Sequence, residues 1–274
     1  MWTRDDAPPH AGDPLPVTDR ATLVLAPNAN AWTFEGTNTW LLAEPGADAC
    51  AVVDPGPDDD AHLAAVLAAA GERRIAEVWV THAHGDHAEL APRLARETGA
   101  VLRAAGRRFP ARPLGGDEVL RVGALEVRVL ATPGHTGDSV CFLLPAEGSV
   151  LTGDTVLGRG SPVVEPGRLG QFFDSLDLLG EVLARPGSVI LPGHGPVLPD
   201  PLPELDRRRA ARLRRVEQVQ QALAAGISDP EALVDRMYPG LPPDLRHAAR
   251  ISVEASIAHV QSARVRTTVD PVPS

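Results

Sequence analysis

Short apolar runs separated by polar turns recur along the first 200 residues. Such runs are typical of buried strands, and apolar positions every third or fourth residue are typical of helices on a core. Because strands and helices follow one another twice over, the pattern predicts an α/β fold of four layers, an αβ/βα sandwich. The expected strands are 21–26, 39–43, 50–53, 75–80, 101–104, 119–122, 125–130, 140–144, 150–151 and 189–191. The expected helices follow residues 58–60 and cover 88–98 and 171–183.

The two ends of the chain have different patterns. Residues 1–20 are polar and proline-rich, so a disordered N-terminal arm is expected there. The sandwich domain is expected over 21–200 and ends in a proline-rich stretch. A small C-terminal helical domain is expected over 201–274. Its helical patterns cover 204–225, 230–238 and 243–265.

Composition restricts the class of protein. With 274 residues, of which 43% are hydrophobic, the chain can bury a full core. No apolar run approaches the ~18–20 residues of a membrane span, and the N-terminus lacks the hydrophobic segment of a secretory signal. A cytoplasmic protein without a membrane association is therefore expected. Cys50 and Cys141 are expected to be buried free thiols, and the net charge of −10 does not favour nucleic acid.

A highly polar stretch directly follows the predicted strand 75–80. The segment 81–87 reads THAHGDH and so offers three histidines and an aspartate. Imidazole and carboxylate are ligands that zinc and similar metals prefer. A single histidine pair is more often a solvated loop, but His135, Asp154 and His194 also follow predicted strands. Because such strand ends meet at one edge of the fold, the sequence predicts a metal site.

The order of these residues resembles the metallo-β-lactamase superfamily, over about residues 20–200. Further motifs resemble the branch that contains lactamase-β-like protein 2, whose C-terminal unit is winged-helix-like; no wing is evident in this sequence. These motifs are GTNTW at 36–40, TPGHT at 132–136, GDTVLG at 153–158 and LPGHGP at 191–196. The resemblance implies a dinuclear metal centre. By it, one metal would be held by His82, His84 and His135, the second by Asp86, His87 and His194, and Asp154 would bridge them.

The cofactors implied are two zinc ions, with manganese or iron as alternatives. Two metals can share a hydroxide, which would be the nucleophile of a hydrolase. Asp86 and Asp154 are expected to be catalytic because they also tune the basicity of that hydroxide.

Other residues of the matching motifs are expected to support this centre. Asp54, Thr81 and Thr132 are expected to orient the ligands without binding metal. Asn38 and Thr136 are expected either to orient ligands or to contact the substrate.

The start of the C-terminal part is rich in arginine, with six arginines over 207–215. They form either a solvated helix face or a grip on phosphate or carboxylate groups, for which Arg208, Arg209 and Arg212 are the candidates. The resembling branch commonly has a His-Arg pair where this chain has Arg208-Arg209, so its binding role does not carry over directly. Near the mouth of the site, Trp32 and Phe34 either contact the substrate or anchor their loop.

Several functions remain open. The resemblance favours a zinc hydrolase, an endoribonuclease on single-stranded RNA. The alternative is a thioester or ester hydrolase on a small or carrier-bound acyl substrate, which the acidic body and the scarcity of aromatic residues in the tail favour. A mononuclear iron sulfur-dioxygenase uses the same motif, but the complete second metal set argues against it. The remaining possibility is a non-catalytic binding module, and seven intact ligands argue against it. No obligate protein partner is evident.

Overall fold

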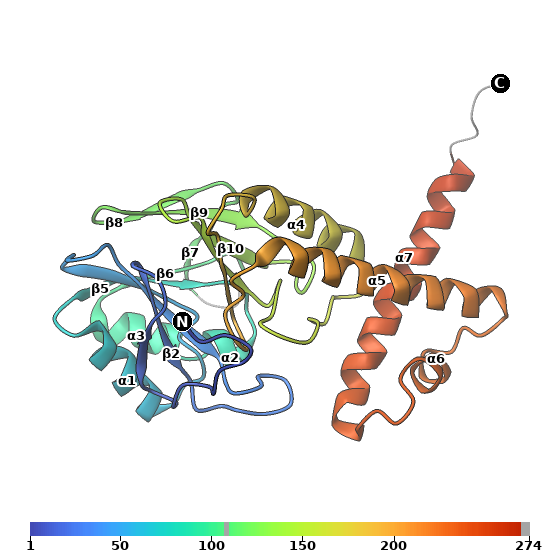
Figure 1. Ribbon diagram of the computed structural model, residues 1–274, viewed down its shortest axis with the longest axis horizontal. Coiled ribbons are helices and arrows are strands. Elements are labelled where there is room, and N and C mark those ends of the chain that lie inside the picture. The colour runs from blue at the N-terminus through green and yellow to red at the C-terminus, as the bar shows by residue number, and fades with distance from the viewer. Residues whose placement is uncertain (107–109, 270–274) are drawn as a thin grey trace.

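The computed structural model describes residues 1–106 and 110–269, with side chains in the last helix described as far as residue 262. Two mixed sheets lie face to face (Figure 1). The larger sheet has seven strands in chain order: β1 (Pro14–Pro16), β2 (Ala21–Leu25), β3 (Asn38–Leu42), β4 (Ala49–Val53), β5 (Arg74–Val80), β6 (Val101–Ala104) and β7 (Arg112–Pro113). The smaller sheet has the order β12-β11-β10-β9-β8, with β8 (Val119–Val122), β9 (Leu125–Ala131), β10 (Val140–Leu144), β11 (Ser149–Gly153) and β12 (Ile190–Pro192).

Helices cover the outer face of each sheet (Figure 1). The helices α1 (Asp60–Ala70) and α3 (Ala91–Thr98) pack on the larger sheet, and α4 (Leu169–Val182) packs on the smaller one. The fold is therefore the four-layer αβ/βα sandwich that the sequence predicted. The helix expected over 88–98 begins later, as α3, and a separate short helix, α2 (Gly85–Ala88), precedes it. Pro92 lies in the first turn of α3, where a proline is tolerated because no backbone N–H is needed.

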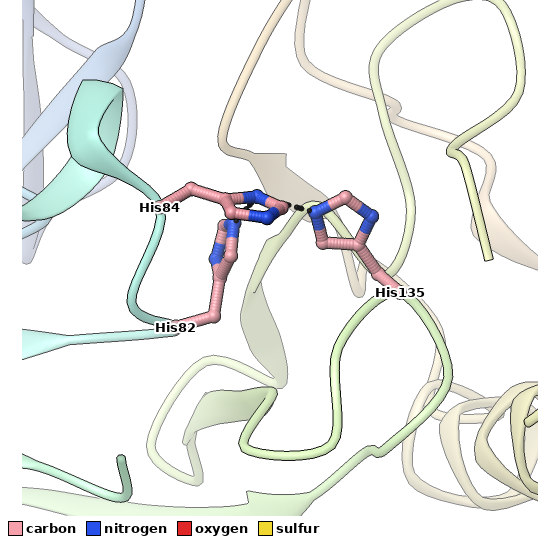
Figure 2. A group of neighbouring side chains, drawn as sticks. All are labelled: His82, His84 and His135. Carbon is pink, nitrogen blue, oxygen red and sulfur yellow. Dashed lines mark hydrogen bonds between the residues drawn. The ribbon is translucent and has the colours of Figure 1, made fainter. Parts of the chain in front are cut away.

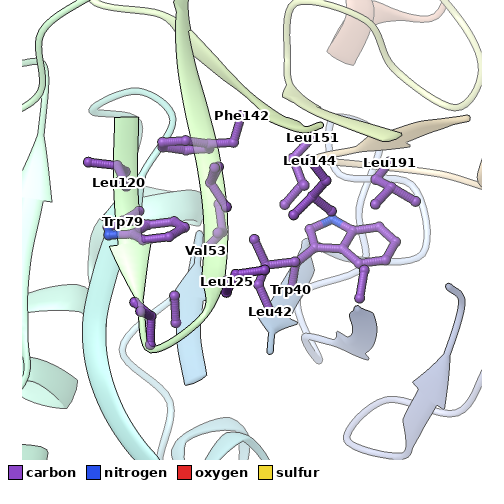
Figure 3. Close-up of a cluster of buried hydrophobic side chains, with 14 of the residues drawn as sticks. Trp40, Leu42, Val53, Trp79, Leu120, Leu125, Phe142, Leu144, Leu151 and Leu191 are labelled. Carbon is purple, nitrogen blue, oxygen red and sulfur yellow. The ribbon is translucent and has the colours of Figure 1, made fainter. Parts of the chain in front are cut away.

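The main core fills the space between the sheets (Figure 3). In this core the rings of Trp79 on β5 and Phe142 on β10 have centroids 5.5 Å apart. The neighbouring Val78 points to the other face, against α1 and α3. Because β4 is buried on both faces, its sequence is continuously apolar, and so is the buried end of β5 over Val78–Val80. Cys50 and Cys141 are buried free thiols, as expected.

The expectation of a disordered N-terminal arm is wrong, because residues 1–20 are ordered and pack against the sandwich. Trp2 is 4% exposed and belongs to the main core, and its carbonyl accepts a hydrogen bond from Val197 N at 3.0 Å. Further along, β1 pairs with β2 at the edge of the larger sheet. Prolines such as Pro14 and Pro16 are compatible with an edge strand, which leaves one side of the strand unpaired. Burial of the Trp2 ring and this pairing hold the arm in place.

The C-terminal part is helical, as predicted, and residues 201–269 contain no strand that would form a wing. Its helices are α5 (Pro201–Ala224), α6 (Pro230–Met237), the short η1 (Pro243–Leu245) and α7 (Arg246–Val269). Leu233, Val234 and Val253 form a small core of their own. Leu205 of α5, however, belongs to the core under α4, so α5 also extends the sandwich. No helix in the described part of the chain is long and apolar enough to cross a membrane.

Candidate metal centre

Three histidine ring nitrogens converge beyond the end of β5 (Figure 2). Nε2 of His82 and Nε2 of His135 each lie 3.0 Å from Nδ1 of His84. His82 and His84 belong to the loop after β5, and His135 belongs to the loop after β9. At this spacing one ion can reach all three nitrogens.

The remaining four predicted ligands lie beside this group. Nε2 of His194 lies 3.1 Å from Nε2 of His87 and 3.1 Å from Oδ2 of Asp86. The two oxygens of Asp154 face different groups, with Oδ1 at 3.4 Å from His87 Nε2 and Oδ2 at 3.7 Å from His135 Nε2. The parallel pairing of β4 with β5 and of β11 with β12 explains why the segments after these strands meet. The structure thus brings all seven predicted ligands together, and metal binding by them stays a prediction.

The donor set fits a cation. Oδ1 of Asp154 is buried and has no hydrogen-bond partner among the described residues, which is costly for a carboxylate oxygen unless a cation satisfies it. Three histidines also donate Nδ1–H to an outer acceptor, so Nε2 is the ring nitrogen that each turns toward the centre and would offer to a cation. The Nδ1–H donors and their acceptors are His87 with Asp54 Oδ2 at 2.9 Å, His135 with Val163 O at 2.7 Å and His194 with Gly36 O at 3.2 Å.

Asp54 organises the loop from outside the centre. Its carboxylate accepts from Thr81 N at 2.8 Å and from Thr81 Oγ1 at 2.7 Å. Because the one hydroxyl proton of Thr81 is used there, Thr81 Oγ1 accepts from His82 Nδ1 at 3.0 Å, so Nε2 is the nitrogen that His82 would offer to a cation as well. The backbone of Asp54 is left-handed, with φ of 49°, a conformation that costs free energy in a residue with a side chain.

A second layer of polar contacts holds Asp54 and the loop that carries His194. Thr39 Oγ1 donates to the Asp54 carbonyl at 2.8 Å and lies 2.9 Å from Nε2 of His62. His62, on α1, is 1% exposed, and no sequence motif marked it. Asn38 Nδ2 donates to the carbonyls on either side of His194, at 2.9 and 2.8 Å. Asn38 therefore orients a ligand loop, which is one of the two roles expected for it.

Thr132 and Thr136, two of the three threonines predicted to support the centre, lie on the side of the smaller sheet. Thr136 Oγ1 lies 2.7 Å from Asp138 Oδ1 and 2.7 Å from Ser139 Oγ, so it closes the turn after His135 and does not line the cavity described below. Thr132 Oγ1 lies 3.1 Å from the Cys141 sulfur. Both side chains stabilise the segment that carries His135.

Two glycines that the sequence analysis did not single out allow the close approach of the loops. A Cβ on Gly193 would lie 2.7 Å from His87 Cε1 and 2.9 Å from Asp154 Oδ1. A Cβ on Gly153 would lie 2.5 Å from Thr81 Oγ1. Each glycine directly precedes a predicted ligand, and this position is the signal that could have identified it.

Acidic and basic side chains at the centre shift one another's pKa values. Burial alone would lower the pKa of His87, but the carboxylates of Asp154, Asp54 and Asp86 outweigh burial and raise that pKa well above its usual value. Burial likewise opposes ionisation of Asp154, yet His194 and His87 hold its pKa well below the usual range. The carboxylates therefore favour a positive charge at the place where the ligands meet.

The arginines of α5 do not form the solvated helix face that was one of the two interpretations of the sequence. The guanidinium of Arg208 is buried and donates to Leu157 O and to Gly160 O, the latter at 2.8 Å, and it pairs with Glu204 at 2.6 Å. Arg209 pairs with Asp177. These contacts dock α5 on the sandwich and count against anion binding by Arg208 and Arg209, because their charges are already paired. Arg212 differs from both and is described below.

A cavity of about 730 Å³ opens from the metal centre. The lining includes predicted ligands such as His84 and Asp154, and much of the remaining lining is apolar. Trp32 and Phe34, both aromatic, line the cavity. The C-terminal helices also contribute to it, which no sequence motif indicated. The apolar lining residues are Ala31, Trp32, Phe34, Leu157, Pro162, Val163, Pro166, Leu245, Ala248 and Ile251.

Comparisons with known proteins agree with this geometry. The family model described as the metallo-β-lactamase superfamily matches residues 32–111 and 103–194. The chain therefore belongs to the metallo-β-lactamase superfamily. Within it, the chain is a hydrolase, as its relatives also indicate.

Two relatives share a printed name, "Atrochrysone carboxyl ACP thioesterase". The one from Aspergillus chevalieri is 34% identical over 220 residues, which cover 77% of this chain and 69% of the relative. The one from Aspergillus fumigatus is 32% identical over 249 residues, which cover 84% and 76%. The crystal structure of a β-lactamase domain protein from Burkholderia ambifaria superimposes with a TM-score of 0.82 at 22% identity, covering 96% of this chain and 91% of that one. At this identity the likeness supports the fold alone.

Proposed function

We propose that this chain hydrolyses the thioester of an acyl group attached to a thiol carrier. The observation that carries the proposal is the cavity, whose lining combines predicted metal ligands with an apolar wall. An apolar wall buries an acyl chain favourably, and the polar groups at its end set where the bond is cleaved. Trp32 and Ile251 lie on that wall and would contact the acyl group.

The cavity is less suited to single-stranded RNA. Its described lining contains Asp86, Asp154 and Glu165 but no arginine, and the chain has no lysine. A polynucleotide backbone needs basic side chains along its path. The thioesterase relatives also favour a thioester substrate over RNA.

The chain's own side chains would hold and orient the reacting groups. The first metal, zinc by preference, would be held by His82, His84 and His135, the second by Asp86, His87 and His194, and Asp154 would lie between them. Such a pair of metals supplies Lewis-acid activation of the thioester carbonyl and of the attacking water. The outer acceptors fix the histidine rings, and the apolar wall excludes bulk water from the acyl group. Asp86, with its side chain 32% exposed, lines the cavity through which water would enter.

A hydrolysis screen tests the proposal. Zinc-loaded and manganese-loaded protein is incubated with acyl thioesters of N-acetylcysteamine and, separately, with labelled single-stranded RNA. Thioester hydrolysis is expected, and it should be lost in His84→Ala but retained in His10→Ala, which removes an exposed histidine far from the site in the sequence. RNA cleavage without thioester hydrolysis, or full thioester activity in His84→Ala, would contradict the proposal.

A further inference from the structure

A second cavity, of about 330 Å³, lies between α5, η1, α7 and the loop 161–163. Two arginines of α5, Arg212 and Arg215, line it together with Tyr238. This cavity shares part of its wall with the cavity of the metal centre. The residues that line both are Ser161, Val163, Leu245 and Ala248.

Arg212 carries a buried charge that no acidic side chain balances. It is 6% exposed, and its Nη2 donates to Ser161 Oγ at 2.8 Å and to Pro162 O at 2.6 Å. Among the described residues no carboxylate pairs with it. Burial lowers the pKa of Arg212; Tyr238 partly opposes this shift, and the neighbouring charge of Arg215 adds to it. A buried guanidinium without a carboxylate is costly unless an anion binds beside it.

Arg215 adds a second cation to the same cavity. Its guanidinium lies over the Tyr238 ring, 4.5 Å from the centroid, and donates to Met237 O at 3.3 Å. Within the described part of the chain it also lacks a carboxylate partner. Stacking on the ring holds the guanidinium plane in place. The arginines at 207–209 differ, because each has a carboxylate partner: Glu204 is shared by Arg207 and Arg208, and Asp177 pairs with Arg209.

From these contacts we infer that Arg212 and Arg215 bind a phosphate group on the thiol carrier of the substrate, while the acyl group occupies the cavity of the metal centre. The identity of the ligand rests on the proposed thioesterase function, and the anion site itself rests on the two unpaired guanidinium groups. Arginine suits this role because its fork donates two parallel hydrogen bonds to phosphate oxygens. The shared wall places the two subsites next to one another.

Paired substrates test the inference. The same acyl group is presented on 4′-phosphopantetheine and on pantetheine, which lacks the phosphate. The wild type is expected to show a KM about tenfold lower for the phosphate-bearing thioester, as the loss of one charge-assisted contact implies. Arg215→Gln should remove this preference and leave hydrolysis of the pantetheine thioester in place. Arg214→Gln, at an exposed neighbour outside the cavity, is the matched control and should keep the preference.

Arg212→Lys is the second variant, because it keeps the charge while losing the planar fork; it should retain part of the preference. Equal KM values for the two thioesters in the wild type would overturn the inference, as would an equal loss in Arg214→Gln.

Direct binding separates this inference from the proposed function. Calorimetry with 4′-phosphopantetheine, pantetheine and inorganic phosphate needs no turnover. Tighter binding of 4′-phosphopantetheine than of the other two, weakened in Arg215→Gln, would support a phosphate subsite for the carrier even if no thioester were hydrolysed. Equal binding of pantetheine and 4′-phosphopantetheine would overturn it. Inorganic phosphate binding as tightly as 4′-phosphopantetheine would also overturn it, since the site would then take free anions.

Discussion

Oδ2 of Asp54 lies 2.9 Å from Nδ1 of His87, and both side chains are almost completely buried. The contact joins the residue after β4 to a predicted ligand beyond the neighbouring parallel strand β5. It turns the opposite nitrogen of His87 toward His194, 3.1 Å away. A carboxylate that binds no metal itself therefore orients a histidine that faces the centre.

Asp54→Asn is expected to weaken metal binding by about 10–100-fold, the usual cost of removing an outer partner of a metal-binding histidine. An amide cannot accept from Thr81 N, Thr81 Oγ1 and His87 Nδ1 as the carboxylate does. Competition of the protein with a coloured zinc chelator measures the affinity. Asp58→Asn, at a partly exposed carboxylate, is the control. Equal affinities of wild type and Asp54→Asn would show that the contact is dispensable.

Gly193→Ala is expected to reduce metal content and activity together while the chain stays folded. The added methyl group would meet His87 and Asp154 at less than normal contact distance. Metal stoichiometry and circular dichroism measure the two properties. Gly180→Ala, on α4 with open space around it, is the control and should stabilise the helix by up to about 1 kcal/mol. A Gly193→Ala protein with full metal content would contradict this account of the loop contact.

Stability in acid should depend on His62. Burial lowers the pKa of His62 to about 4, whereas an unfolded histidine titrates near ~6.5. Between these values the unfolded chain binds the additional proton, so the free energy of unfolding falls as the pH falls. Between pH 7 and 4.5, the wild type is expected to lose about 2 kcal/mol more than His62→Gln. Urea unfolding of metal-depleted protein measures this, and parallel pH curves would refute it.

The apolar wall should set selectivity among acyl groups. Ile251→Trp replaces an aliphatic side chain of the cavity lining by a bulky aromatic ring. The ratio of kcat/KM for a long over a short acyl thioester is expected to fall about tenfold, the usual scale for a steric change in an apolar pocket. Arg250→Gln, at the exposed position before it, is the control. An unchanged ratio in Ile251→Trp would place the acyl chain elsewhere.

Much of the fold and the ligand set could be predicted because their signals are local. Buried strands need apolar residues on both faces, so β4 and β5 appear as apolar runs. Ligands such as His82 and Asp154 follow such runs directly, and the order of the motifs matched a known superfamily. The burial of Trp2 could not be predicted, because a single aromatic residue in a polar, proline-rich arm gives no periodic signal even though its ring is buried.

The sequence by itself determined the strands, the helices and the residues able to bind metal, because each depends on neighbouring positions. Only the tertiary structure decided which distant groups meet. The burial of His62, the pairing of Arg209 with Asp177 on α4 and the unpaired charge of Arg212 depend on how α1 and α5 pack. A run of arginines looks uniform along the chain, but packing gives each guanidinium a different partner, and burial without a carboxylate distinguishes Arg212 from its neighbours.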